Sequence, residues 1–212
     1  MKKLILLPLA LTFATNAAMA ANSVDLRVTG TITPAACDIS MSGGDFDLGT
    51  INANKETITS FTTSTKTLNI LCSSDTLVGI KGIDNRADST ATANPNRSEY
   101  GLGFDNIQNK IGTYWVHLGG DSNEVNIGAS TGTLIRSNDN GTSWVSNAAN
   151  GLKNGPNDVH SWNNTTATDG PLSVTSVSIP LDLYVEIQPT NNLDTSQTIT
   201  LDGSATIELV YL

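Results

Sequence analysis

The feature that most constrains this chain is an alternation of apolar and polar residues with a period of two. In the longest example, every second residue from Val177 to Ile187 is apolar. A second example closes the chain, and its apolar positions are Ala205, Ile207, Leu209 and Tyr211. Side chains of a β-strand point alternately to opposite faces, so each run predicts a strand with one face on a core.

Shorter runs with the same period recur along the chain. They cover residues 24–32, 68–72, 78–80 and 114–118, and clusters of Gly, Asn, Asp and Pro separate them. Because no window has the spacing of an amphipathic helix, the sequence predicts an all-β fold, a sandwich or a barrel.

The composition of the chain excludes several classes of fold and of partner. Only 15% of the residues are charged, 38% are hydrophobic, and the net charge is −9. Such a chain does not suit a coiled coil or a helix bundle, and it lacks the clustered Lys and Arg that neutralise phosphates. We therefore expect no nucleic-acid partner.

The first twenty residues have the form of a signal peptide. Lys2 and Lys3 precede an apolar stretch from Leu4 to Phe13, which is too short to span a bilayer, and small residues follow up to Ala20. We predict cleavage after residue 20, export to a bacterial periplasm, and a single domain at 21–212. Two polar stretches, 84–99 and 147–170, are expected to be loops inserted into that domain.

Export also determines how the cysteines are interpreted. Cys37 and Cys72 are the only two in the chain, so an oxidising compartment allows one pairing. Closing this loop would stabilise the fold by about 4 kcal/mol on the chain-entropy model. A catalytic thiol is the alternative, but there is no Cys-x-x-Cys, and His117 and His160 are remote in sequence.

Other chemical motifs are few. The sequence predicts neither an enzyme nor a cofactor or metal site, because its carboxylates are scattered and no two histidines have the spacing of zinc ligands. One stretch resembles the Asp box of sialidases, which is a structural hairpin, and its matching residues are Ser137, Asp139, Gly141 and Trp144. We predict a hairpin turn there.

The apolar strand at the C-terminus leaves two possibilities open. An uncovered apolar edge strand promotes aggregation. Either this strand therefore lies centrally in the sheet, or another chain completes the sheet beside it.

The two ends of the chain resemble chaperone–usher pilins. Residues 28–32 look like the first strand of these proteins, with Gly30 seven residues before the first cysteine. Cys72 follows an apolar run, as the second cysteine of a pilin does, and the chain ends with a penultimate tyrosine, Tyr211.

This resemblance implies an immunoglobulin-like β-sandwich that lacks its last strand. In that family a periplasmic chaperone lends a strand to the open groove, and the N-terminal extension of another subunit replaces it at an outer-membrane usher. The groove would include Ala205, Ile207, Leu209 and Tyr211. Val24, Leu26 and Val28 would either form the donor segment or belong to the subunit's own first strand.

Two functions follow as expectations. The first is a structural subunit of a fimbrium at the bacterial surface, which polymerises with other pilin subunits by donor-strand exchange. The second is a secreted carbohydrate-binding adhesin module, in which Trp115, Trp144 or Trp162 stacks on a host glycan.

Overall fold

The computed structural model describes residues 26–32, 36–91, 98–120, 123–147, 151–164 and 170–212. The chain divides into two units, residues 1–33 and 34–212. In the first unit, residues 26–32 adopt neither helix nor strand, and all are exposed. The predicted signal peptide and Val24 lie outside the described residues.

The second unit is built of β-strands. Across its described ranges there are twelve: β1 (Cys37–Ser42), β2 (Thr59–Thr62), β3 (Lys66–Thr76), β4 (Val78–Asp84), β5 (Tyr100–Gly101), β6 (Gly112–Leu118), β7 (Glu124–Ile127), β8 (Ser130–Ser137), β9 (Val145–Ser146), β10 (Val159–Asn163), β11 (Val174–Ile187) and β12 (Ala205–Tyr211). Two 3₁₀ turns, η1 (Ala87–Ser89) and η3 (Thr190–Asn192), lie between strands. The all-β prediction is confirmed. Within the described ranges, no helix has the length and apolar character needed to cross a membrane.

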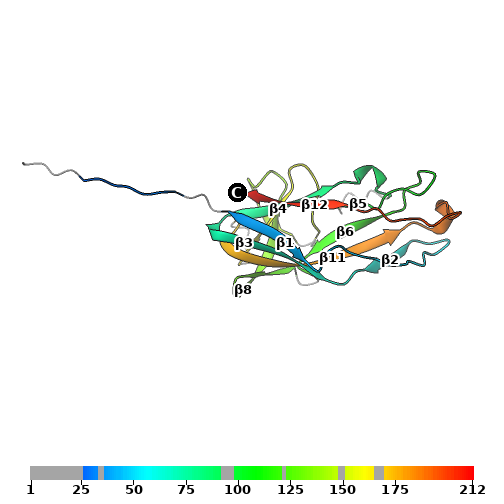
Figure 1. Ribbon diagram of the computed structural model, residues 1–212, viewed down its shortest axis with the longest axis horizontal. Coiled ribbons are helices and arrows are strands. Elements are labelled where there is room, and N and C mark those ends of the chain that lie inside the picture. The colour runs from blue at the N-terminus through cyan, green and yellow to red at the C-terminus, as the bar shows by residue number, and fades with distance from the viewer. Residues whose placement is uncertain (1–25, 33–35, 92–97, 121–122, 148–150, 165–169) are drawn as a thin grey trace, which may run out of the picture. The chain divides into compact units, whose positions relative to one another are not determined.

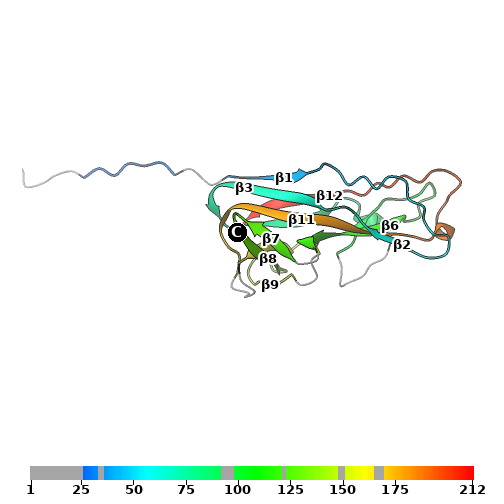
Figure 2. The same cartoon turned by 90° about the horizontal axis from the view of Figure 1, so that it is seen from below.

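The strands form one hydrogen-bonded sheet with two ends. Its main path is β1-β3-β11-β7-β8-β10-β4-β12, and β2, β5, β6 and β9 branch from it. Every pair along the path is antiparallel. The end strands β1 and β12 therefore run in opposite directions, as Figures 1 and 2 show.

The sheet closes on itself almost completely. The backbone N–H of Cys37, at the start of β1, donates a hydrogen bond of 3.0 Å to the Tyr211 hydroxyl, at the end of β12. No strand of the described chain lies between these two end strands. We call this gap the seam.

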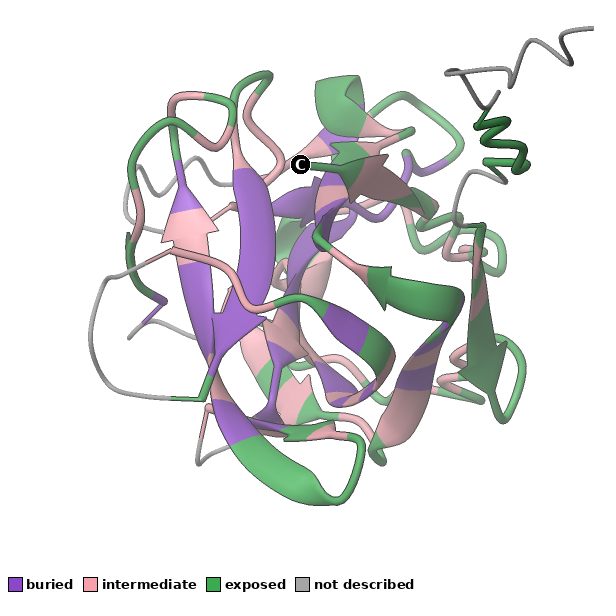
Figure 3. Cartoon of the chain, turned by 90° about the vertical axis from the view of Figure 1, so that its left-hand side faces the viewer, coloured by how far each residue is buried: buried purple, intermediate pink, exposed green. Residues whose placement is uncertain are grey.

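The core lies inside the sheet and is made mainly of the alternating residues. Ile179 and Val185 of β11 are fully buried, and Ile80 of β4 and Leu118 of β6 pack in the same cluster. Figure 3 shows that some strands are buried along most of their length, whereas others are largely exposed.

Two predictions about strands are wrong. Residues 26–32 of the predicted first strand lie outside the sheet, which begins at Cys37. Leu26, Val28 and Ile32 are 89%, 87% and 99% exposed. An alternating pattern predicts a strand with two different faces, but it does not show whether the same chain supplies the neighbouring strand that such a strand needs.

The second error concerns residues 147–170, predicted to be a polar loop. They contain β10, in which all five residues are buried. Because both faces of β10 are covered, its sequence shows no alternation, and His160 and Trp162 are each 0% exposed. The other predicted loop, 84–99, contains η1, where the Ser89 hydroxyl donates to the carbonyl of Arg86.

Candidate functional site

The seam presents main-chain groups on both sides. Asn85 donates its N–H to the carbonyl of Ser204, and Leu212 donates its N–H to the carbonyl of Leu77. Leu77 and Asn85 flank β4, so the even-numbered residues of β12 direct their main-chain groups toward β4. In an antiparallel pair the intervening residues point the other way. The odd-numbered residues of β12 therefore direct their N–H and C=O groups into the seam.

The same alternation holds for β1. Ser73 donates to the carbonyl of Ala36, so the even-numbered residues face β3 and the odd-numbered ones face the seam. The bond from Cys37 to Tyr211 is consistent with this pattern. Two strand edges thus face each other with hydrogen-bonding groups directed into the space between them.

Beneath the seam lies a groove with a largely apolar floor and a volume of about 1040 Å³. Leu68, Val116 and Leu181 contribute to its floor. Of the four predicted groove residues on β12, Ala205 and Ile207 line this cavity. Leu209 packs on the core farther along, and Tyr211 is 56% exposed at the end of the seam.

Sequence reasoning missed the continuation of the groove beyond the strands. Phe46 and Leu48 line one side after β1, and Ile199 and Leu201 line the other before β12. The signal was present, because the alternation of β12 extends upstream through Gly203 to residue 199. Phe46 and Leu48 likewise alternate with Asp45 and Asp47.

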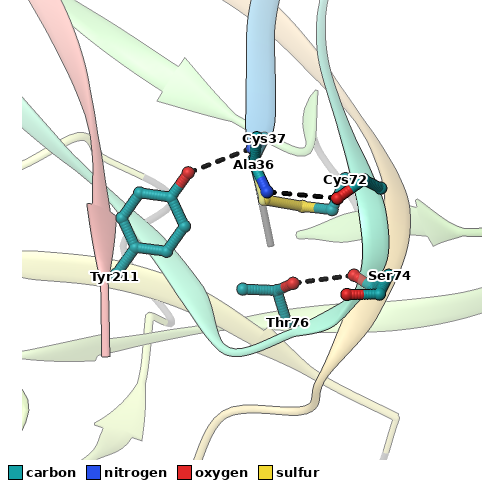
Figure 4. The surroundings of a disulfide bond; sticks show 7 residues. Ala36, Cys37, Cys72, Ser74, Thr76 and Tyr211 are labelled. Carbon is teal, nitrogen blue, oxygen red and sulfur yellow. Dashed lines mark hydrogen bonds between the residues drawn. A yellow bond between two sulfur atoms is a disulfide. The ribbon is translucent and has the colours of Figure 1, made fainter. Parts of the chain in front are cut away.

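A disulfide fixes one end of the seam (Figure 4). Cys37 and Cys72 are bonded, and their Cα atoms are 4.0 Å apart at directly opposed positions of β1 and β3. Tyr211 points toward Cys37 from the other side of the seam. Both cysteines are consumed in this bond, which excludes a free catalytic thiol at either position.

The Asp-box-like residues lie at the end of β8 and in its connection to β9. The Ser137 hydroxyl donates to the Asp139 carboxylate at 2.6 Å, and Ser143 donates from its backbone and its hydroxyl. These bonds to the charged form lower the pKa of Asp139 to about 2. Trp144 donates its indole N–H to the carbonyl of Gly141. The geometry is that of a tight structural turn.

The tryptophans do not form an exposed aromatic platform. Trp162 is 0% exposed and Trp115 is 7% exposed. Trp115 stacks on Tyr184, with ring centroids 4.1 Å apart, and donates its N–H to His117. Trp144 is half-buried against its own turn. Among the described residues, no three His, Cys, Asp or Glu side chains are grouped in a way that would hold a metal ion.

Comparison with known proteins defines the family. Residues 26–131 match the model of a family described as "Protein of unknown function (DUF1120)". The chain is 30% identical to the "Uncharacterized protein YhcF" of Escherichia coli (strain K12), over 94% of this chain and 95% of that protein. It is 25% identical to the "Protein GltF" of the same organism, over 96% and 94%. No solved structure matches.

The fold and the site define an all-β protein with an open, apolar seam between its first and last strands. The chain belongs to the DUF1120 family.

Proposed function

We propose that this protein is a structural subunit of a bacterial surface fimbria, exported through the periplasm and polymerised by donor-strand exchange. The observation that carries the proposal is the seam, where an apolar groove lies between two strand edges that face each other. An added strand would satisfy the main-chain groups of both edges and cover the groove in one step.

The strand order supports an immunoglobulin-like sandwich of the pilin type. The path has β1-β3-β11 at one end and β10-β4-β12 at the other. In such a sandwich these two groups would belong to the two layers, and the missing last strand would lie between β12 and β1.

The chain itself carries a segment with the required pattern. Leu26, Val28 and Ile32 are exposed, and Arg27, Thr29 and Thr31 alternate with them. Burying three such apolar side chains would contribute about 5 to 8 kcal/mol. Val24 continues the pattern upstream, so we assign the donor to residues 24–32 of a second copy or a related subunit.

The direction of the donor follows from the edges. Because β1 and β12 are antiparallel, any inserted strand is parallel to one of them and antiparallel to the other. In the subunit–subunit complex we place the donor antiparallel to β12, because β12 has seven residues and β1 has six, and this direction makes the longer pair the more stable antiparallel one. Before assembly, a periplasmic chaperone would fill the same seam, and an outer-membrane usher would exchange the chaperone for the next subunit.

Site-specific cross-linking between full-length chains tests this proposal. One variant carries Val28→Cys and the other carries either Ile207→Cys or Leu209→Cys, the two groove-side residues that can lie beside Val28 in adjacent registers; the native disulfide occupies both natural cysteines. We expect a covalent dimer after oxidation of at least one of these two mixtures. Replacing Ile207→Cys with Thr206→Cys is the matched control, because residue 206 points away from the groove and should give little dimer. A purified chain that stays monomeric, with no cross-link in any mixture, would contradict the proposal.

A further inference from the structure

The charges on the two sides of the seam have one sign. The only charged residue of β1 is Asp38, and the only charged residue of β12 is Glu208. Both are exposed, whereas their neighbours Ile39 and Ile207 are half-buried toward the groove. The outer rim of the seam is therefore acidic on both of its edges.

The donor segment, residues 24–32, carries one acidic and one basic side chain, Asp25 and Arg27. Arg27 is its only basic residue and so its only group that can attract the acidic rim. If Leu26 and Val28 enter the groove, Arg27 points outward, because side chains alternate along a strand. It then lies on the same outer face as Asp38 and Glu208.

We propose that Arg27 of one copy is a specificity-determining residue that recognises Asp38 and Glu208 of the next copy; this inference rests on the donor-strand exchange proposed above. Cys37 faces Tyr211 across the seam, so Asp38 lies opposite the Val210 region and Ser40 lies opposite the Glu208 region.

Either of two adjacent registers brings these charges together. With Leu26 beside Leu209, Arg27 lies directly beside Glu208 and diagonal to Asp38. With Leu26 beside Tyr211, Arg27 lies beside Asp38 and diagonal to Glu208. Diagonal neighbours in a sheet are within reach of a long side chain such as arginine, so Arg27 reaches an acidic side chain in either register. Asp25 of the donor lies beside Asp38 in the first register and beyond it in the second, so only the first register adds a like-charge contact.

The nearest basic group on the acceptor does not replace this contact. Lys81 of β4 is paired with Glu208, on the edge of β12 that faces away from the seam, and its amine donates to Asn140. The side of Glu208 toward the seam is open to an incoming cation. Since exposed charge pairs act mainly on encounter and partner choice, the effect should appear in the rate of exchange and should weaken with salt.

The test measures the assembly rate of the full-length chain at low salt. We expect Arg27→Glu to slow assembly about tenfold and Arg27→Lys to retain most of the rate. A triple variant, Arg27→Glu with Asp38→Lys and Glu208→Lys, should recover the rate because all three charges are reversed. High salt should bring the wild type and Arg27→Glu closer together.

The outcomes separate this inference from the proposed function. If the wild type does not assemble, both fail. If it assembles and Arg27→Glu is equally fast, or if the triple variant stays as slow as Arg27→Glu, only the role of Arg27 is overturned. Residue 27 lies outside the folded unit of residues 34–212, so a failure of that unit to fold does not confuse the single-variant result.

Discussion

β11 and β12 have the same sequence pattern but different surroundings. β11 pairs with β3 and β2 along one edge and with β7 and β6 along the other. β12 pairs only with β4 among the described strands. The inward residues Ile179 and Val185 of β11 are fully buried, whereas Ile207 and Leu209 of β12 are only partly buried.

This difference shows what an alternating pattern does and does not determine. It predicts that a segment forms a strand with one apolar face, because both strands satisfy that condition. It does not determine how many neighbours the strand has. The seam differs from the rest of the sheet in two ways. The apolar face of β12 is incompletely buried there, and the strands that border it, β1 and β12, each pair with a strand on only one edge in the described sheet.

The largest loss of stability should come from removing the disulfide at the end of the seam. Replacing both Cys37 and Cys72 with serine should lower the free energy of unfolding by about 4 kcal/mol, because a 35-residue loop is no longer closed in the unfolded chain. Urea unfolding of the oxidised wild type and the double variant measures this. The wild type under reducing conditions is the control and should match the variant; a loss below about 1 kcal/mol would show that the disulfide contributes little.

A matched pair of core substitutions compares the two strands directly. Ile179→Ala in β11 should cost about 3 kcal/mol, because it leaves a cavity among fully buried residues. Ile207→Ala in β12 should cost about 1 kcal/mol in the isolated chain, since that side chain already lies beside an open groove. Equal losses in chemical denaturation would mean that β12 is as enclosed as β11.

Sequence reasoning predicted the strands whose two faces differ, including β11 and β12. It failed at β10, where Val159 and His160 are both buried and the pattern therefore has no period. It also assigned residues 26–32 to a strand, because an alternating pattern does not show whether the chain provides a neighbouring strand for that segment.

For the groove, the sequence predicted Ala205 and Ile207 but not Ile199 or Leu201. Their alternation was readable, yet its continuation across Gly203 was overlooked. Tyr211 was predicted as a groove residue, whereas its hydroxyl bonds to Cys37 at the end of the seam. A contact between residues 174 positions apart requires the closed sheet and has no local sequence signal.

Acid should lower the free energy of unfolding through His160, which is buried in β10. Burial, together with Arg136 and Lys153, lowers its pKa to about 3 from an ordinary value of 6.5. Between these values the unfolded chain binds a proton that the folded chain does not. The free energy of unfolding should therefore fall by about 1.4 kcal/mol for each pH unit below 6.5.

This dependence is measured by urea unfolding between pH 6.5 and about 5, where carboxylates with ordinary pKa values remain mostly ionised. His160→Gln keeps an acceptor for the Lys153 N–H but cannot titrate. The free energy of unfolding of this variant should therefore depend less steeply on pH, by about 1.4 kcal/mol per pH unit. An unchanged slope in this variant would rule out His160 as the titrating group.

The smallest losses of stability should come from removing single tyrosine hydroxyls, one in the core and one at the seam. Tyr100, fully buried in the core, donates to the carbonyl of Leu152 at 3.1 Å, whereas Tyr211 accepts from Cys37 across the seam. Tyr100→Phe leaves a buried carbonyl without its donor and should cost about 1.5 kcal/mol. Tyr211→Phe should cost about 0.5 kcal/mol, because water can replace the lost acceptor at a residue that is 56% exposed. Hydrogen exchange of the Cys37 amide should rise in Tyr211→Phe while amides of β11 stay protected. If exchange rose equally in β11, the bond across the seam would be holding the whole sheet together rather than one open end.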